Sequence, residues 1–265
     1  MVQQGNGYGI CGLIKRILLE YRYFTCKNWT LREVGEFWDS VTDYDDINEN
    51  TYSYYRRFTN SWYLAKDYVR ENMVMLDIQS RTGKGTEFWF EKGVIKESFL
   101  VDFSDFLLNV AQSRLKNTNY DYKLLKILAY RLPFEDDFFD LVTTYETIEH
   151  IGNVDIFMQE ITRVLKPGGL VILTCPNILW EPVHWFAAIF NVHHSEGPHN
   201  FLRRKRLIRL FKCNYLEILH ENTTIILPFN NKISISVNEK IEKVIPESVI
   251  RLIGLRRSFV LRRQY

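Results

Sequence analysis

The chain has 265 residues, of which 46% are hydrophobic and 25% are charged, and its formal net charge at pH 7 is +2. This balance excludes a disordered chain, and no apolar run approaches the roughly 18–20 residues that a membrane-spanning helix needs. The four cysteines are scattered without a CxxC pair, which argues against a disulfide framework or a zinc site and leads us to expect a cytoplasmic protein.

Residues 1–70 are predicted to form a helical, aromatic extension that acts as a lid. The segment ICGLIKRILLEYRYF spaces its apolar and basic residues as an amphipathic helix does. Such a helix packs on its own domain or lies on a membrane surface, so peripheral membrane contact stays open. Lys15 and Arg16 stand where a signal peptide needs its apolar stretch, which argues against secretion. The tyrosine-rich stretch 52–63 is expected to cover one side of an acceptor pocket.

From residue 71 onward, short apolar runs alternate with helical segments, which predicts strands joined by right-handed crossovers. The runs are MVMLDI, SFLVDF, KLLKIL, DLVTTY and LVILTC. Their continuous apolar character indicates strands covered on both faces, and therefore an open α/β sheet. Gly93 is predicted to end the first helix, Ser104 to cap the second, and Pro167-Gly168-Gly169 to form a turn before the fifth strand.

After Asn177 the pattern changes. Residues 178–200 are rich in aromatic residues and histidine, and we interpret them as an insertion that walls the acceptor pocket. A helix (LRRKRLIRLF), two strand-like segments (YLEILHE and TTIILPF), one helix (VNEKIEKVIPESVIRLIG) and a terminal strand (SFVLRRQY) follow. Residues 201–265 hold 14 Lys and Arg against 5 Asp and Glu, a balance of 14 − 5 = +9. This charge indicates either a solvated face or attraction to an anionic partner.

Ligands of open α/β sheets bind beyond the carboxyl ends of the strands, where the strand order reverses. Asp77 closes the first predicted strand, and the small residues Ser80, Thr82 and Gly83 lie in the loop that follows. Asp102 closes the second strand about 20 residues further on, where an acidic side chain can accept hydrogen bonds from both ribose hydroxyls of a nucleoside. The sequence therefore predicts a nucleoside site at this edge.

Five segments follow one another here as they do in class I S-adenosylmethionine-dependent methyltransferases. They are VMLDIQSRTGKGT, LVDFS, RLPFEDDFFDLVTTYETIEHI, ITRVLKPGGLVILTCPN and HNFLRRKRLIRLF. The chain most resembles the small-molecule branch that includes quinone-biosynthesis O-methyltransferases, over about Met73 to Cys213. The resemblance implies a doubly wound, mostly parallel, seven-stranded sheet of the Rossmann-like methyltransferase fold over residues 71–265. It also implies S-adenosylmethionine as the cofactor.

The resemblance further implies a set of cofactor-binding positions. The loop after the first strand is expected under the methionine part, Asp102 at the ribose hydroxyls and Phe103 beside the adenine. Ala129 and Tyr130 are expected at the adenine edge and Tyr145 at the sulfonium, although Phe103 and Tyr145 could equally be packing residues. The complete set is Asp77, Gln79, Ser80, Gly83, Asp102, Phe103, Ala129, Tyr130 and Tyr145.

Three positions depart from the family pattern. The family loop reads roughly Asp-x-Gly-x-Gly-x-Gly, whereas the first two glycines are Gln79 and Arg81 here, and Leu128 replaces the usual acid after the third strand. Glycine serves where the backbone takes a positive φ or a ligand approaches closely. Gln79 could offer an amide to the methionine carboxylate and Arg81 a positive charge. A catalytically inactive methyltransferase-fold binding protein is therefore one alternative.

The predicted function is methyl transfer to a small-molecule acceptor, through oxygen of a sugar, natural product or lipid-like compound. His199, His194 and His150 are the candidates for the base or for orienting the acceptor. Together with Glu146 and Glu149, His150 and His199 resemble the metal site of plant-type small-RNA 2′-O-methyltransferases. Because Glu-His is widespread in metal-free relatives, no metal is predicted.

An RNA-modifying enzyme is the second alternative, suggested by the basic C-terminal part. The chain lacks a recognised RNA-binding module, which argues against this alternative, and no DNA partner is expected. The sequence does not predict an oligomeric state.

Overall fold

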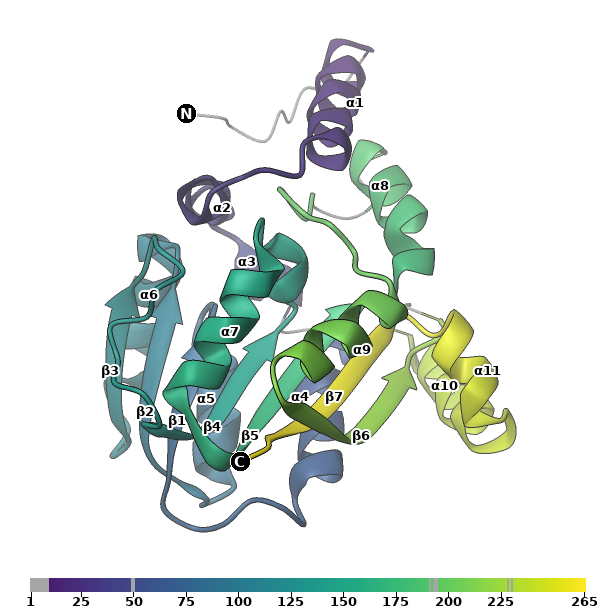
Figure 1. Cartoon of the computed structure of the whole chain (residues 1–265). Coiled ribbons are helices and arrows are strands. Elements are labelled where there is room, and N and C mark those ends of the chain that lie inside the picture. Colours follow the sequence, from purple (N-terminus) through teal and green to yellow (C-terminus); the bar gives the residue numbers. More distant parts are fainter. Residues whose placement is uncertain (1–9, 49–50, 191, 193–194, 228, 230) are drawn as a thin grey trace.

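A computed structural model describes residues 10–48, 51–190, 192, 195–227, 229 and 231–265. Seven strands form one sheet in the order β3-β2-β1-β4-β5-β7-β6 (Figure 1). They are β1 (Met73–Ile78), β2 (Ile95–Asp102), β3 (Asp121–Lys126), β4 (Phe139–Tyr145), β5 (Leu165–Pro176), β6 (Leu216–Thr224) and β7 (Arg256–Arg263). Only β7 runs antiparallel to its neighbours, β5 and β6. The α/β, doubly wound, mostly parallel fold is thereby confirmed.

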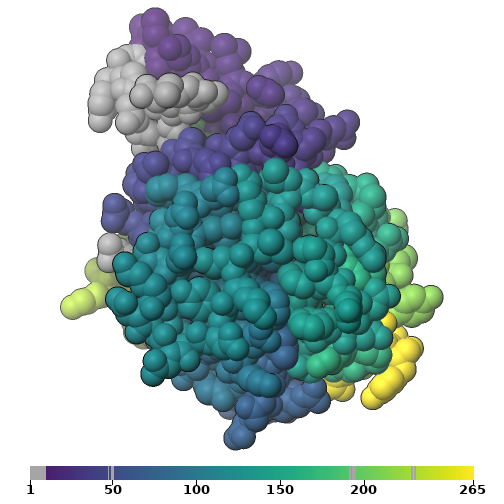
Figure 2. Space-filling model, turned by 90° about the vertical axis from the view of Figure 1, so that its left-hand side faces the viewer, coloured from purple at the N-terminus to yellow at the C-terminus, as the bar shows by residue number. Residues whose placement is uncertain are grey.

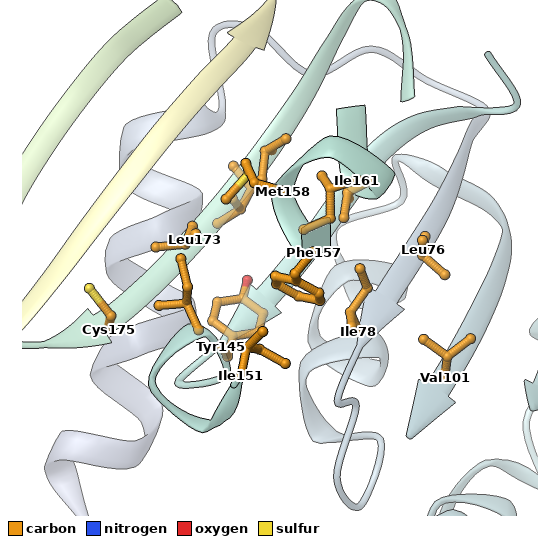
Figure 3. Packing of buried hydrophobic residues seen from close by; sticks show 14 of the residues in the cluster. Leu76, Ile78, Val101, Tyr145, Ile151, Phe157, Met158, Ile161, Leu173 and Cys175 are labelled. Atoms are coloured by element: carbon orange, nitrogen blue, oxygen red, sulfur yellow. The ribbon is translucent and has the colours of Figure 1, made fainter. Parts of the chain in front are cut away.

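Helices cover both faces of the sheet. In Figure 1, α7 (Val154–Val164) and α9 (Arg204–Cys213) lie in front of it, and α4 (Tyr52–Ala65) and α5 (Lys84–Glu91) lie behind it. Phe157, Met158 and Ile161 of α7 are at most 4% exposed and face Ile78 and Leu173 of the sheet (Figure 3). Burying such side chains stabilises the fold by roughly 1.5–3 kcal/mol each, so the packing of α7 on the sheet holds the strand ends in fixed positions.

The remaining helices are α1 (Ile10–Thr25), α2 (Leu31–Asp39), α3 (Tyr44–Asn48), α6 (Asp105–Leu115), α8 (Glu181–Ile189), α10 (Lys232–Val244) and α11 (Glu247–Ile253). Two short 3₁₀ turns, Ile148–His150 and Ile178–Trp180, follow β4 and β5. The N-terminal helices pack over one end of the α/β domain (Figure 2). No helix within the described ranges is both long and apolar enough to span a membrane.

Local capping signals acted as the sequence predicted. Gly93 takes a positive φ of 72° just after α5, and its N–H donates to the carbonyl of Phe90. The Ser104 hydroxyl caps α6 by accepting from the Leu107 N–H at 3.1 Å. Both devices satisfy backbone groups that helix ends leave without intrahelical partners.

Three local predictions were wrong. Pro167-Gly168-Gly169 lies inside β5 and not in a turn before it, and the pairing with β4 shifts register between Phe139 and Leu141. The predicted helix over 237–254 is two helices, because Pro246 lacks an N–H and forces Ile245 into an extended conformation with ψ 134°.

The third error concerns TTIILPF, which is not a separate strand. Its two threonines complete β6, and Ile225, with a φ of 66°, turns the chain away from the sheet. A β-branched residue rarely adopts this conformation, so neither its apolar character nor its β propensity predicted the end of the strand.

Candidate active site

The loop after β1 keeps a glycine-like backbone without the glycines. Gln79 and Arg81 both have φ 54°, and Gly83 has φ 76°. The left-handed conformation costs a non-glycine residue about 1–2 kcal/mol. The loop therefore follows the path that alternating glycines would allow, but it carries two long side chains along that path.

Asp77 holds this loop in place. It is 1% exposed, and its two carboxylate oxygens accept hydrogen bonds from Thr143 Oγ1 at 2.8 Å and Thr86 Oγ1 at 2.7 Å. Burial raises the pKa of Asp77 to about 6, although both hydroxyls oppose that shift. Because the threonines come from β4 and α5, Asp77 ties the loop to the elements on either side of it.

Asp102 ends β2 beside the same loop. Its Oδ1 accepts from the N–H groups of Phe103 at 2.7 Å and Ser104 at 3.0 Å, and its Oδ2 accepts from the Arg81 N–H at 2.8 Å. The residue is 0% exposed, and burial raises the pKa of its carboxyl. Asp102 thus lies at the predicted edge, with three backbone donors bound and no surface open to a ligand.

Helix α2 covers this region. A Cβ atom added at Gly35 would lie 2.2 Å from the Phe103 carbonyl oxygen, so the helix backbone rests directly on the end of β2. Asp39 Oδ1 accepts from Ser104 Oγ at 2.5 Å and from the Phe106 N–H at 3.1 Å. The side of Asp102 that faces solvent in an open site is therefore sealed by the N-terminal extension.

The Arg81 side chain extends away from Asp102 and fills the adjoining space. Its guanidinium lies 3.7 Å from the centroid of the Trp38 ring, and one of its Nη atoms is 3.4 Å from the Glu146 carbonyl oxygen. Arg81 is only 6% exposed. Its backbone N–H thus binds Asp102 while its side chain lines the neighbouring cavity.

That cavity has a volume of about 550 Å³. Its wall includes Trp38, Tyr44 and Arg57 from the N-terminal helices, Arg81, Glu146 and His150 from the strand ends, Val183 and His184 from α8, and Ile225 and Leu227 after β6. Pockets of roughly 300–1,000 Å³ suit small-molecule ligands. None of the nine predicted cofactor-binding residues is among the residues that line it.

Of the two candidate catalytic histidines that lie within the described residues, His150 and His199, only His150 lines this cavity. It is 1% exposed, and its Nδ1 lies 2.9 Å from the Pro198 carbonyl oxygen. Burial, with a contribution from Arg81, lowers the pKa of His150 to about 3. The ring is therefore neutral near pH 7, with Nδ1–H donating to the carbonyl and Nε2 left as an acceptor.

The other candidates lie elsewhere. His199 is 2% exposed, its Nδ1 lies 2.8 Å from the Gly197 carbonyl oxygen, and burial lowers its pKa. His194 lies outside the described residues. The Tyr145 hydroxyl accepts from Trp89 Nε1 at 2.7 Å, and the residue is 5% exposed in the core. Ala129 is exposed, and the half-buried Tyr130 hydroxyl accepts from the Asn153 N–H at 2.9 Å.

The carboxylates near His150 do not form a metal site. Burial and the neighbouring Glu146 raise the pKa of Glu149 well above its usual range, which favours the protonated acid. In the part of the chain that the structure describes, no three His, Cys, Asp or Glu side chains converge so as to hold a metal ion.

The structure fits one end of the predicted cofactor and not the other. The methionine end could lie in the cavity, whose polar wall includes Arg57, Arg81 and Glu146. The adenosine end would need contact with Asp102 and Phe103, which are 0% and 1% exposed under α2. Sequence reasoning expected the stretch 52–63 over the pocket but did not single out Arg57, and it missed Trp38, because no spacing relates either residue to the strand ends.

The comparisons with known proteins agree with the fold. A family model described as a methyltransferase domain matches residues 76–173. A ubiquinone/menaquinone biosynthesis C-methyltransferase of Cupriavidus metallidurans is 29% identical over 158 residues, which cover 59% of this chain and 65% of that protein. Its counterpart in Burkholderia multivorans is 29% identical over 150 residues, covering 56% and 62%. The chain thus spans less than two thirds of the length of these curated relatives.

Solved structures share the architecture. The (4+2)-cyclase SpnF has a TM-score of 0.64 at 14% identity, covering 89% of this chain and 96% of that chain. Phosphoethanolamine N-methyltransferase 2 of Haemonchus contortus, in complex with S-adenosyl-L-methionine, has a TM-score of 0.56 at 19% identity, covering 78% and 53%. These identities speak for the fold alone. Residues 76–173 are thus similar to a methyltransferase domain, and the chain as a whole shares the fold of these solved structures.

Proposed function

We propose that this chain transfers the methyl group of S-adenosylmethionine to a small-molecule acceptor held in the 550 Å³ cavity. The observation that carries the proposal is the position of this cavity, where Glu146 and His150 follow β4 at the carboxyl edge of the sheet. The chain's own residues would hold the acceptor and exclude water, which is most of what positioning contributes to such a reaction.

Oxygen remains the proposed acceptor atom, although the curated relatives are named C-methyltransferases. The pKa of His150, about 3, makes it a poor proton acceptor at neutral pH. A hydroxyl that is itself acidic, as in a phenol or enol, needs little help from a base. This favours an aromatic or enolic natural product over a sugar among the proposed acceptors.

Calorimetry with S-adenosylmethionine, followed by assay of S-adenosylhomocysteine formation with a panel of phenols and sugars, tests the proposal. We expect saturable binding and turnover with phenols. Absence of binding heat at millimolar S-adenosylmethionine would contradict the proposed function.

The sealed Asp102 favours one second candidate, a methyltransferase-fold protein that does not transfer methyl groups. SpnF, which is named as a cyclase, shares this architecture. Binding of cofactor without methylation of any acceptor would support this candidate instead.

A further inference from the structure

Arg57 is a buried cation that forms no direct ion pair with any of the described residues. It lies on α4, is 7% exposed and lines the cavity. Its guanidinium is 4.5 Å from the Tyr54 ring centroid and 5.8 Å from that of Phe58. Its Nε has no hydrogen-bond partner, and among the described residues no hydrogen bond or ion pair to its guanidinium is found.

Two other buried arginines near the sheet have a polar side-chain partner, which Arg57 lacks among the described residues. Arg256 Nε lies 3.2 Å from Glu146 Oε1, and an Nη of Arg257 donates to Asn177 Oδ1 at 2.9 Å. The two acids of the cavity wall are also engaged, Glu146 with Arg256 and Glu196 with His184 at 3.1 Å. Burial lowers the pKa of Arg57, but the nearby Tyr44 and Glu146 outweigh burial and raise it, so the guanidinium stays charged although no acid contacts it directly.

We infer that Arg57 binds an anionic oxygen group, a carboxylate or phosphate, on the ligand of this cavity. The planar guanidinium matches such groups with two parallel hydrogen bonds, and Arg57 lines the cavity in which the ligand would lie. The inference rests on the proposed function for the identity of that ligand. The anion is either the methionine carboxylate of the cofactor or an acid group of the acceptor.

Calorimetry on the full chain can separate the two sources. We would compare S-adenosylmethionine with its decarboxylated analogue on the wild type, Arg57→Gln, Arg57→Lys and Arg209→Gln. Arg209 is an exposed arginine of α9 and serves as the matched control. If the cofactor supplies the anion, the wild type should prefer the carboxylate form by roughly 10- to 100-fold, and the preference should vanish in Arg57→Gln alone.

If Arg57→Gln still prefers the carboxylate form of the cofactor, binding of acceptor-like probes is measured next, to test whether the acceptor supplies the anion. Here 4-hydroxybenzoate and phenyl phosphate would be compared with 4-hydroxybenzamide as uncharged probe. Loss of a preference for either anionic probe in Arg57→Gln, with retention in Arg209→Gln, supports the acceptor as the source. The inference is overturned if Arg57→Gln changes no charge preference in either arm. Absence of cofactor binding in the wild type counts against the proposed function, while the probes still test Arg57.

Folding is checked with Arg57→Met, which keeps the length of the side chain and removes its charge. Because Arg57 makes no side-chain hydrogen bond among the described residues, this variant should unfold at a urea concentration close to that of the wild type. It should still lose the preference for the anionic ligand. A variant that unfolds more easily would indicate that the guanidinium is there for stability, contrary to the inference.

Discussion

Two neighbouring regions at the carboxyl edge of the sheet differ in whether their charged groups have hydrogen-bond partners within the protein. In the filled half (Asp77, Asp102 and Phe103), each carboxylate oxygen accepts a hydrogen bond from the protein. In the open half, which is the 550 Å³ cavity, the Arg57 Nε atom has no hydrogen-bond partner among the described residues. Satisfied groups stabilise the empty protein, and unsatisfied ones indicate where a ligand contributes.

The largest expected effect is in the filled half. Asp102→Ala leaves the N–H groups of Arg81, Phe103 and Ser104 without their acceptor, so the free energy of unfolding should fall by roughly 3 kcal/mol or more. Urea denaturation measures this. Asp155→Ala, which removes an exposed partner of Arg206, should change it by less than about 1 kcal/mol. Similar losses in both variants would end the distinction between the two halves.

Asp77 makes the comparison depend on pH. Burial raises its pKa in the folded protein to about 6, against 3.8 ordinarily, so the folded state binds this proton more tightly. The resulting stabilisation is fully present below pH 3.8 and is lost as pH rises to about 6, a change of roughly 3 kcal/mol. Unfolding free energies from pH 4 to 7 should therefore fall for the wild type relative to Asp77→Asn. If the unfolding free energies of the wild type and Asp77→Asn changed in parallel with pH, the raised pKa of Asp77 would be contradicted.

A substitution in α2 can weaken the packing of this helix on the filled half. Gly35→Ala places a Cβ atom against the Phe103 carbonyl oxygen, so α2 must shift, at a cost of roughly 1–3 kcal/mol of stability. Limited proteolysis should cut the N-terminal helices faster in this variant. Glu36→Ala changes an exposed residue of the same helix and should behave as the wild type. Equal protection in both variants would argue against a tight seal.

The smallest expected effect concerns the boundary between the halves. Arg81→Gly removes the side chain that separates Asp102 from the cavity and relieves the strain at φ 54°. We expect S-adenosylmethionine to bind about tenfold more tightly, or about 1.4 kcal/mol, by calorimetry. Arg81→Lys keeps a long cation and should stay near the wild type. Weaker binding by the glycine variant would make Arg81 a cofactor contact and not a barrier.

Local patterns in the chain were sufficient to predict the strands of the sheet and the ends of two of its helices. Apolar runs, the cap at Ser104 and the stop at Gly93 act through neighbours within a few residues, so they can be read in order. They also placed Asp77 and Asp102 at the ends of β1 and β2. The errors at Pro246 and Ile225 arose where one backbone conformation overrode a longer apolar pattern.

The sequence by itself therefore determined the fold, the ends of the strands and the acids placed there, because short-range sterics and hydrophobic periodicity decide those features. Only the tertiary structure decided which side chains fill the space at the carboxyl ends of the strands and which of them line an open cavity there. The contact of Gly35 with Phe103, the stacking of Arg81 on Trp38 and the exposure of Arg57 to the cavity join segments far apart in the chain. No local rule relates such residues, since their proximity follows from how the N-terminal helices pack on the sheet.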